Sequence, residues 1–135
     1  MFVSTKSSKE EIMPPKISAI VIAQHARFRE GIQILLTSIS RIDEVFPVES
    51  LTEALSLTAI TAPFAVIMDS QSANLDLSIA LRQIGDTWHG ASRIVLVEDK
   101  KESHQAKVNG AELVLVKGFN ASKFISEIEE ILKKR

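Results

Sequence analysis

The 135-residue sequence contains no cysteine, and no stretch of it approaches the ~18 consecutive apolar residues that a membrane span requires. Without cysteine, disulfide bonds, thiolate catalysis and cysteine-ligated metal are excluded, and a reducing compartment is compatible with the chain. Residues 1–16, MFVSTKSSKEEIMPPK, also lack the long apolar centre of a signal peptide. We therefore expect a cytoplasmic protein that does not engage a membrane.

An excess of charge of either sign is missing as well. The 16 Lys and Arg residues nearly balance the 17 Asp and Glu residues, so the formal net charge is −1. No broad basic field is available to attract nucleic acid, and we expect no direct contact with DNA or RNA. Hydrophobic residues make up 45% and charged residues 24%, which is typical of one globular domain of this length.

Short apolar runs rich in β-branched residues recur along the chain and predict five strands. They are residues 17–23, 44–48, 64–68, 93–97 and 112–116. Proline cannot donate a hydrogen bond to a sheet, so Pro47 predicts that the second strand lies at an edge.

Helical periodicity separates these runs. In residues 27–39 the apolar side chains follow a helical spacing, at Phe28, Ile32, Leu35, Leu36 and Ile39. Capping boxes begin two further helices, at SLTE (50–53) and DKKE (99–102). Two more amphipathic stretches complete a set of five helices, at residues 75–85 and 124–132. Gly31 costs its helix about 1 kcal/mol relative to alanine, so something else must favour a small residue there.

Strands that alternate with helices at this spacing are parallel and are joined by right-handed crossovers, with helices on both faces. The predicted fold class is therefore α/β: a flavodoxin-like, doubly wound, five-stranded parallel sheet of order 2-1-3-4-5 with five helices. Residues 1–15 are interpreted as a flexible tail and residues 16–135 as the folded domain. In such sheets, functional residues gather at the carboxyl ends of the strands.

The residues at the carboxyl ends of the predicted strands form a candidate site. They include Ala23, Gln24, Asp69, Gln71, Val97, Glu98 and Lys117. An ammonium group on the same rim as a carboxylate pairs with it or with an anion bound to it, so Asp69 and Lys117 are expected to lie together. No Gly-rich phosphate loop follows any predicted strand, and no nucleophile–base pair is evident, so we expect no enzymatic activity.

Three stretches carry a resemblance to a known family. QHARFREGIQILL (24–36) is similar to the first strand–helix junction of response-regulator receiver domains, the phosphoacceptor modules of two-component signalling and phosphorelays. AVIMDSQSANLD (65–76) is similar to the strand and loop around their phosphorylated aspartate. NGAELVLVKGF (109–119) is similar to their last strand with its lysine and aromatic residue. The chain resembles the subgroup that precedes helix-turn-helix output domains, over residues 16 to about 133.

The resemblance implies that Asp69 stands at the phosphoacceptor position and Lys117 at that of its phosphate or counter-ion partner. In the family, an acidic pair, the acceptor aspartate and a backbone carbonyl two residues beyond it hold a divalent cation. Here Ala23 and Gln24 replace the acidic pair, so only Asp69 and the Gln71 carbonyl remain, as weak metal candidates. Mg²⁺ dehydrates reluctantly and is usually held through carboxylates. We therefore expect no cofactor and at most weak Mg²⁺ binding.

The residues that read out phosphorylation in the family are also missing. A serine or threonine ends the family's fourth strand, whereas the aligned position here is Val97 or Glu98. The aromatic residue of the fifth strand is replaced by Val114. Receipt of phosphate and its mechanical readout are therefore both expected to be impaired. We interpret the chain as a pseudo-receiver in which Lys117 holds Asp69 as a structural pair.

The resulting hypothesis is a signalling domain that acts through protein–protein contact. Its partner would be a kinase, an output domain, another regulator or a second copy of the chain. The resemblance places the contact face at about residues 100–109, 112–116 and 122–133. One alternative is a working response regulator that is phosphorylated on Asp69. The other is a flavodoxin-like domain that binds a small molecule at the same strand ends.

Overall fold

The computed structural model describes residues 16–58, 62–73 and 76–135. Five strands form one sheet, in which every neighbouring pair is parallel. They are β1 (Ser18–Ile22), β2 (Glu44–Val48), β3 (Ala65–Asp69), β4 (Ser92–Val97) and β5 (Leu113–Val116). Their order, β2-β1-β3-β4-β5, is the predicted one, so the flavodoxin-like α/β class is confirmed. The predicted tail, residues 1–15, lies outside the described residues.

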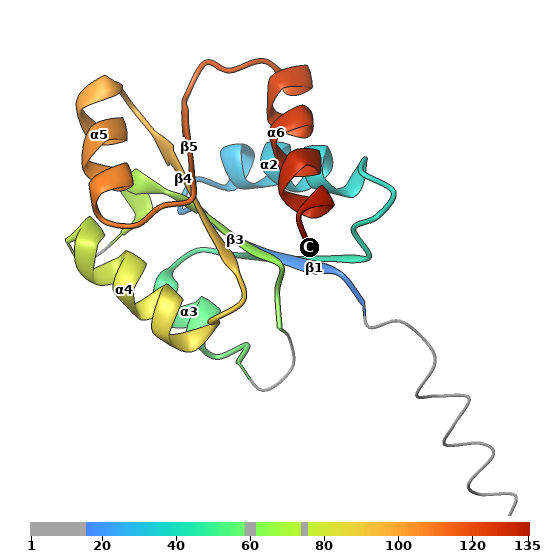
Figure 1. Cartoon of the computed structure of the whole chain (residues 1–135), viewed down its shortest axis with the longest axis horizontal. Coiled ribbons are helices and arrows are strands. Elements are labelled where there is room, and N and C mark those ends of the chain that lie inside the picture. The colour runs from blue at the N-terminus through green and yellow to red at the C-terminus, as the bar shows by residue number, and fades with distance from the viewer. Residues whose placement is uncertain (1–15, 59–61, 74–75) are drawn as a thin grey trace, which may run out of the picture.

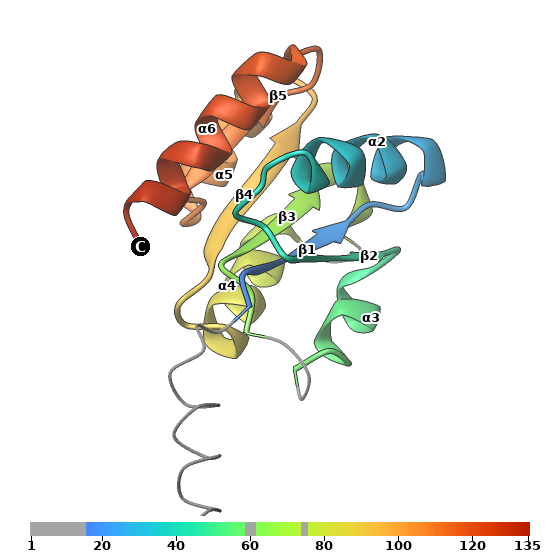
Figure 2. The same ribbon diagram turned by 90° about the vertical axis from the view of Figure 1, so that its right-hand side faces the viewer.

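Helices cover both faces of the sheet (Figures 1 and 2). They are α2 (Ala26–Thr37), α3 (Leu51–Leu55), α4 (Leu77–Thr87), α5 (Lys100–Val108) and α6 (Ala121–Lys133). Helices α2 and α6 pack on one face, and α3, α4 and α5 pack on the other. The start predicted for α4, at residue 75, lies outside the described residues. None of the described helices is long and apolar enough to cross a membrane.

The central strands are buried on both sides because helices cover each face. All residues of β1 and β3 are buried. Neighbouring residues point to opposite faces: Val21 and Ile67 pack with α2 and α6, whereas Ile22 and Met68 pack with α3 and α4. Strand β2 is largely exposed or half-buried and forms an edge of the sheet, as Pro47 predicts.

Both predicted capping boxes begin a helix. The Ser50 side chain accepts a hydrogen bond from the Glu53 N–H at 3.1 Å, and the Asp99 side chain accepts one from the Glu102 N–H at 2.9 Å. Each glutamate carboxylate in turn accepts from the N–H of the residue just before the cap. These contacts satisfy backbone N–H groups that a helix start otherwise leaves without a partner.

Gly31 lies on the outward side of α2. A Cβ added there would meet no atom within 4 Å among the described residues, so a close neighbour is not the reason for the small residue. The same helix buries Ile32 and Leu36 against the sheet, so the core lies on its other side. Packing within the described domain therefore does not explain the glycine.

Arg93 and Glu112 join the beginning of β4 to the residue before β5. Arg93 Nη2 lies 2.8 Å from Glu112 Oε2, and Arg93 Nε lies 3.2 Å from Oε1. The guanidinium packs beside Gly110, whose φ of +104° favours glycine. Burial acts to raise the pKa of Glu112, but the hydrogen bonds and charge of Arg93 outweigh burial and hold the pKa below its ordinary value of 4.5.

We expect this ion pair to make the fold sensitive to acid. A carboxylate with a depressed folded-state pKa stabilises the fold at neutral pH, and that contribution is lost as pH falls through the folded-state pKa. In Glu112→Gln the free energy of unfolding at neutral pH should fall by about 0.5–1 kcal/mol, since the pair is partly exposed. The variant should also lose less stability than the wild type below about pH 4.5. Urea unfolding across this range measures the difference, and parallel pH profiles would contradict the prediction.

Candidate functional site at the carboxyl ends of the strands

The carboxyl ends of β3 and β5 bring Asp69 and Lys117 to one rim of the sheet. Asp69 is the last residue of β3 and is in register with Leu96 of β4. Lys117 follows β5, and its N–H donates to the Val97 carbonyl at 2.8 Å. The Lys117 Nζ lies 2.8 Å from Asp69 Oδ1. The predicted neighbourhood of these two residues is confirmed.

The Asp69 side chain is 1% exposed, although it carries a charge. Its Oδ1 accepts hydrogen bonds from Lys117 Nζ and, at 3.2 Å, from the Gln71 N–H. Its Oδ2 is buried and has no hydrogen-bond partner among the described residues. One oxygen is therefore held by the protein, and the other is covered by it.

Lys117 is shared between two carboxylates. Besides Asp69, its Nζ contacts Glu98 Oε2 at 2.5 Å, and it lies 4.8 Å from the centre of the Phe28 ring. Burial acts to lower the pKa of Lys117, but hydrogen bonds to Asp69 and Glu98 and their negative charges together raise it. The ammonium group is thus charged at neutral pH and already balanced by two anions. The sequence places Glu98 on this rim, at the end of a strand, but does not indicate its pairing with Lys117.

Ala23 and Gln24, the two positions where the resemblance places an acidic pair, are joined to the rest of the rim by hydrogen bonds. Ala23 is buried and carries no side-chain oxygen, and its carbonyl accepts from Arg29 Nη1 at 2.7 Å. The Gln24 N–H donates to Ser72 Oγ at 2.7 Å. Ser72 is 2% exposed and belongs to the 3-10 turn η1 (Ser70–Ser72), which follows β3. Neither Arg29 nor Ser72 was identified from the sequence.

This arrangement does not fit a magnesium ion. Mg²⁺ requires near-octahedral oxygen ligands and is usually bound through carboxylates. In the described part of the chain, no group of three or more acidic, histidine or cysteine side chains could hold a metal. Asp69 Oδ1 is engaged by Lys117, and Asp69 Oδ2 is covered. The weak candidate pair of Asp69 and the Gln71 carbonyl therefore supplies too few free anionic oxygens.

The positions aligned with the family's readout residues are used for packing and pairing. Val97 is fully buried at the end of β4, and half-buried Val114 of β5 packs against the same cluster of apolar residues. Glu98, the other candidate at this position, is paired with Lys117. None of the three side chains carries a hydroxyl group.

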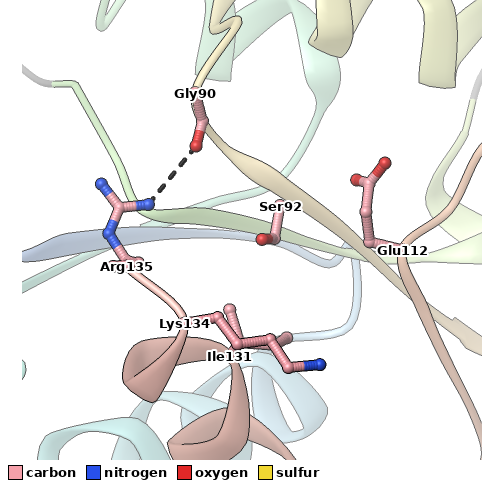
Figure 3. Close-up of a pocket in the computed structure, with 6 residues that line it drawn as sticks. All are labelled: Gly90, Ser92, Glu112, Ile131, Lys134 and Arg135. Carbon is pink, nitrogen blue, oxygen red and sulfur yellow. Dashed lines mark hydrogen bonds between the residues drawn. The ribbon is translucent and has the colours of Figure 1, made fainter.

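A separate hollow lies at the opposite end of the sheet. It has a volume of about 610 Å³ and is lined by Gly90, Ser92, Glu112, Ile131, Lys134 and Arg135 (Figure 3). Within this lining, Arg135 reaches toward Gly90 and donates to its carbonyl at 3.3 Å (Figure 3). Neither Asp69 nor Lys117 lines this hollow, so it does not support a small-molecule site at the carboxyl ends of the strands.

Comparisons with solved structures agree on the fold, whereas comparisons of the sequence find no match. No family model and no curated protein matches the sequence. The receiver domain of the response regulator NarL from Mycobacterium tuberculosis matches with a TM-score of 0.76 at 19% identity, over 90% of this chain and 100% of that one. A LuxR-family two-component response regulator from Aurantimonas sp. SI85-9A1 matches with a TM-score of 0.76 at 22% identity, over 90% of this chain and 88% of that one.

The chemotaxis response regulator CheY4 of Vibrio cholerae is similar as well. It matches with a TM-score of 0.74 at 15% identity, over 87% of this chain and 99% of that one. At these identities the similarity establishes that the chain has the receiver-domain fold, which the sequence resemblance implied.

Proposed function

We propose that this protein is a signalling domain that acts through protein–protein contact and does not use metal-dependent phosphorylation of Asp69. The observation that carries the proposal is the state of that carboxylate. Asp69 is 1% exposed, one of its oxygens is bonded to Lys117, and the other is covered. The fold supports a place in two-component signalling, and the rim argues against the usual chemistry.

Phosphoryl transfer to a carboxylate needs two things that this rim lacks. The donor phosphorus must approach a carboxylate oxygen in line with its leaving group, and cations must balance the negative charge gathered there. Asp69 offers no oxygen that is both exposed and free of Lys117. Lys117 is already neutralised by Asp69 and Glu98, and Ala23 and Gln24 supply no anion for a metal.

The surface around α5, β5 and α6 is the contact face that we propose for a protein partner. Val108 of α5 is 69% exposed and Val116 of β5 is 39% exposed, so apolar side chains are available there. The near-zero net charge of the chain favours a protein partner over nucleic acid. A kinase, an output domain or another regulator fits this proposal, in a cytoplasmic setting, and a homodimer through this face is the second form.

One observation favours the alternative of a working phosphoacceptor. The aspartate and the lysine that the resemblance assigns to phosphate chemistry are both present and lie in direct contact, 2.8 Å apart. A loop movement that uncovers Asp69 would then be required before any transfer.

Exposure to a phosphodonor separates the two functions. With acetyl phosphate and Mg²⁺, we expect no mass increase of about 80 Da, the mass of an added phosphoryl group. We also expect no amide NMR shift at residues 69–73 up to about 10 mM Mg²⁺, because too few carboxylates face the rim. Asp69→Asn controls for transfer to other side chains. An adduct on the wild type that Asp69→Asn lacks would overturn the proposal.

A further inference from the structure

Glu102 makes contacts that its place in a capping box does not require. It lies in the first turn of α5, and its side chain is half-buried. Its Oε1 accepts the capping-box hydrogen bond from the Glu98 N–H at 3.0 Å and, in addition, one from Ser70 Oγ at 2.7 Å. Its Oε2 accepts from Gln71 Nε2 at 3.2 Å. The carboxylate thus joins the turn after β3 to the beginning of α5.

Glu53 shows what the capping role alone looks like. It occupies the same position in the first turn of α3, and its N–H donates to the Ser50 side chain. Its carboxylate accepts from the Glu49 N–H at 3.3 Å, which corresponds to the Glu98 contact of Glu102. Glu102 also accepts bonds from the side chains of Ser70 and Gln71 in the turn after β3. Among the described residues, Glu53 makes no corresponding bond to a second loop.

The contacts of Glu102 complete a closed ring of contacts that includes Asp69. Asp69 Oδ1 bonds to Lys117, Lys117 bonds to the Glu98 side chain, and the Glu98 N–H bonds to Glu102. Glu102 bonds to Ser70, which is the residue covalently attached to Asp69. The ring therefore ties β3, β4, β5 and α5 together at the edge where Asp69 Oδ2 is covered.

We propose that Glu102 is a positioning residue: a latch that holds the turn Ser70–Ser72 over Asp69 and fixes this turn to α5. Ser70 and Gln71 of this turn donate hydrogen bonds to the Glu102 carboxylate. Hydrogen bonds to a charged acceptor are stronger than those between neutral groups. Linkage makes the coupling reciprocal. A partner that moves α5 and withdraws Glu102 releases the turn and uncovers Asp69, and any ligand that opens the turn loosens the start of α5.

The inference goes beyond the proposed function and does not depend on it. The latch holds whether or not Asp69 ever accepts a phosphoryl group, because it rests on hydrogen bonds within the chain. Its test accordingly uses neither metal nor phosphodonor. A negative result would remove the latch and leave the proposed function standing, and a phosphorylated Asp69 would do the reverse.

Three variants test the latch in the full chain. Glu102→Ala removes the carboxylate, and Ser70→Ala removes one of its donors while leaving α5 and its cap intact. Glu53→Ala is the matched control, since it removes a first-turn glutamate with the local capping contact alone. Two readouts apply: amide hydrogen exchange at Gln71, and coupling of glycine ethyl ester to Asp69 by a water-soluble carbodiimide, read by mass spectrometry.

The wild type and Glu53→Ala should leave Asp69 unlabelled and Gln71 protected. In Ser70→Ala and Glu102→Ala, we expect exchange at Gln71 to accelerate about tenfold and Asp69 to become labelled, because a hydrogen bond to a charged group is lost. The double variant Ser70→Ala/Glu102→Ala should add little to Glu102→Ala, since the bond that Ser70→Ala removes is already lost in Glu102→Ala.

Two outcomes overturn the latch. In the first, Ser70→Ala and Glu102→Ala both keep wild-type exchange and labelling. In the second, Glu53→Ala opens Asp69 as much as Glu102→Ala does, which would make the effect one of general helix destabilisation. If Glu102→Ala fails to fold, Ser70→Ala decides the question by itself, because it leaves every contact of α5 with its own cap in place.

Discussion

Lys117→Met is expected to lower the free energy of unfolding by about 3 kcal/mol, the scale seen when one partner of a buried ion pair is removed. Asp69→Asn is expected to cost only about 1 kcal/mol. The two substitutions break the same 2.8 Å contact between Lys117 and Asp69. The difference between their costs therefore measures how much more one residue depends on the contact than the other.

The two costs differ because Asp69 and Lys117 differ in burial and in the partners that each keeps after the other is replaced. Without Lys117, the charge of Asp69 stays at 1% exposure with the Gln71 N–H as its remaining described donor. Without the charge on Asp69, Lys117 keeps Glu98 and is 24% exposed, so it stays solvated and paired. An isolated buried charge is far more costly than a partly exposed one.

Urea unfolding followed by circular dichroism measures these costs. The double variant Lys117→Met/Asp69→Asn should be about 1 kcal/mol less stable than Asp69→Asn alone, because no buried carboxylate is then left unpaired. Equal costs for the two single variants, or additive costs in the double variant, would show that Asp69 is not a charge that depends on Lys117.

Restoring an acidic pair should make the stability of this fold depend on Mg²⁺. In Ala23→Asp/Gln24→Asp, a carboxylate is placed at position 23, which is 1% exposed and follows Ile22, the register partner of Met68 just before Asp69. Unpaired buried charge destabilises by a few kcal/mol, so without Mg²⁺ we expect a melting temperature about 10 °C below the wild type. Millimolar Mg²⁺ should recover much of this loss, since a ligand that binds only the folded state stabilises it.

The wild type is the control for the effect of Mg²⁺ on stability. Its melting temperature should not respond to Mg²⁺ beyond the response to NaCl at matched ionic strength, because Ala23 and Gln24 contribute no carboxylate. Differential scanning calorimetry of both proteins measures the shifts. A wild-type stabilisation specific to Mg²⁺ would contradict the account of this rim.

Part of the site follows from the sequence through simple geometry. Parallel strands end at the same edge of a sheet, so residues 69 and 117 had to share a rim once the strand order was inferred. The burial of Asp69 could not be predicted from the sequence in the same way. The apolar run predicts a strand that stops at residue 68, whereas β3 includes Asp69 and holds it inside the sheet. Strand ends depend on pairing with neighbours, which a single run of residues does not contain.

Contacts between loops were beyond sequence reasoning. The pattern DKKE indicates a capping role for Glu102, and the structure confirms it. Nothing in that pattern indicates that the same carboxylate reaches Ser70, 32 residues away in the sequence. The bond between Gln24 and Ser72 spans 48 residues and is equally hidden.

By itself, the sequence determined the α/β class, the order of the strands and the lack of carboxylates at positions 23 and 24, because periodicity and chemical identity do not depend on coordinates. Only the tertiary structure decided that Asp69 keeps one oxygen covered, that Glu98 shares Lys117 and that Glu102 closes the ring. The physical reason is that burial and hydrogen bonding are set by where side chains from separate loops meet, and folding alone brings those loops together.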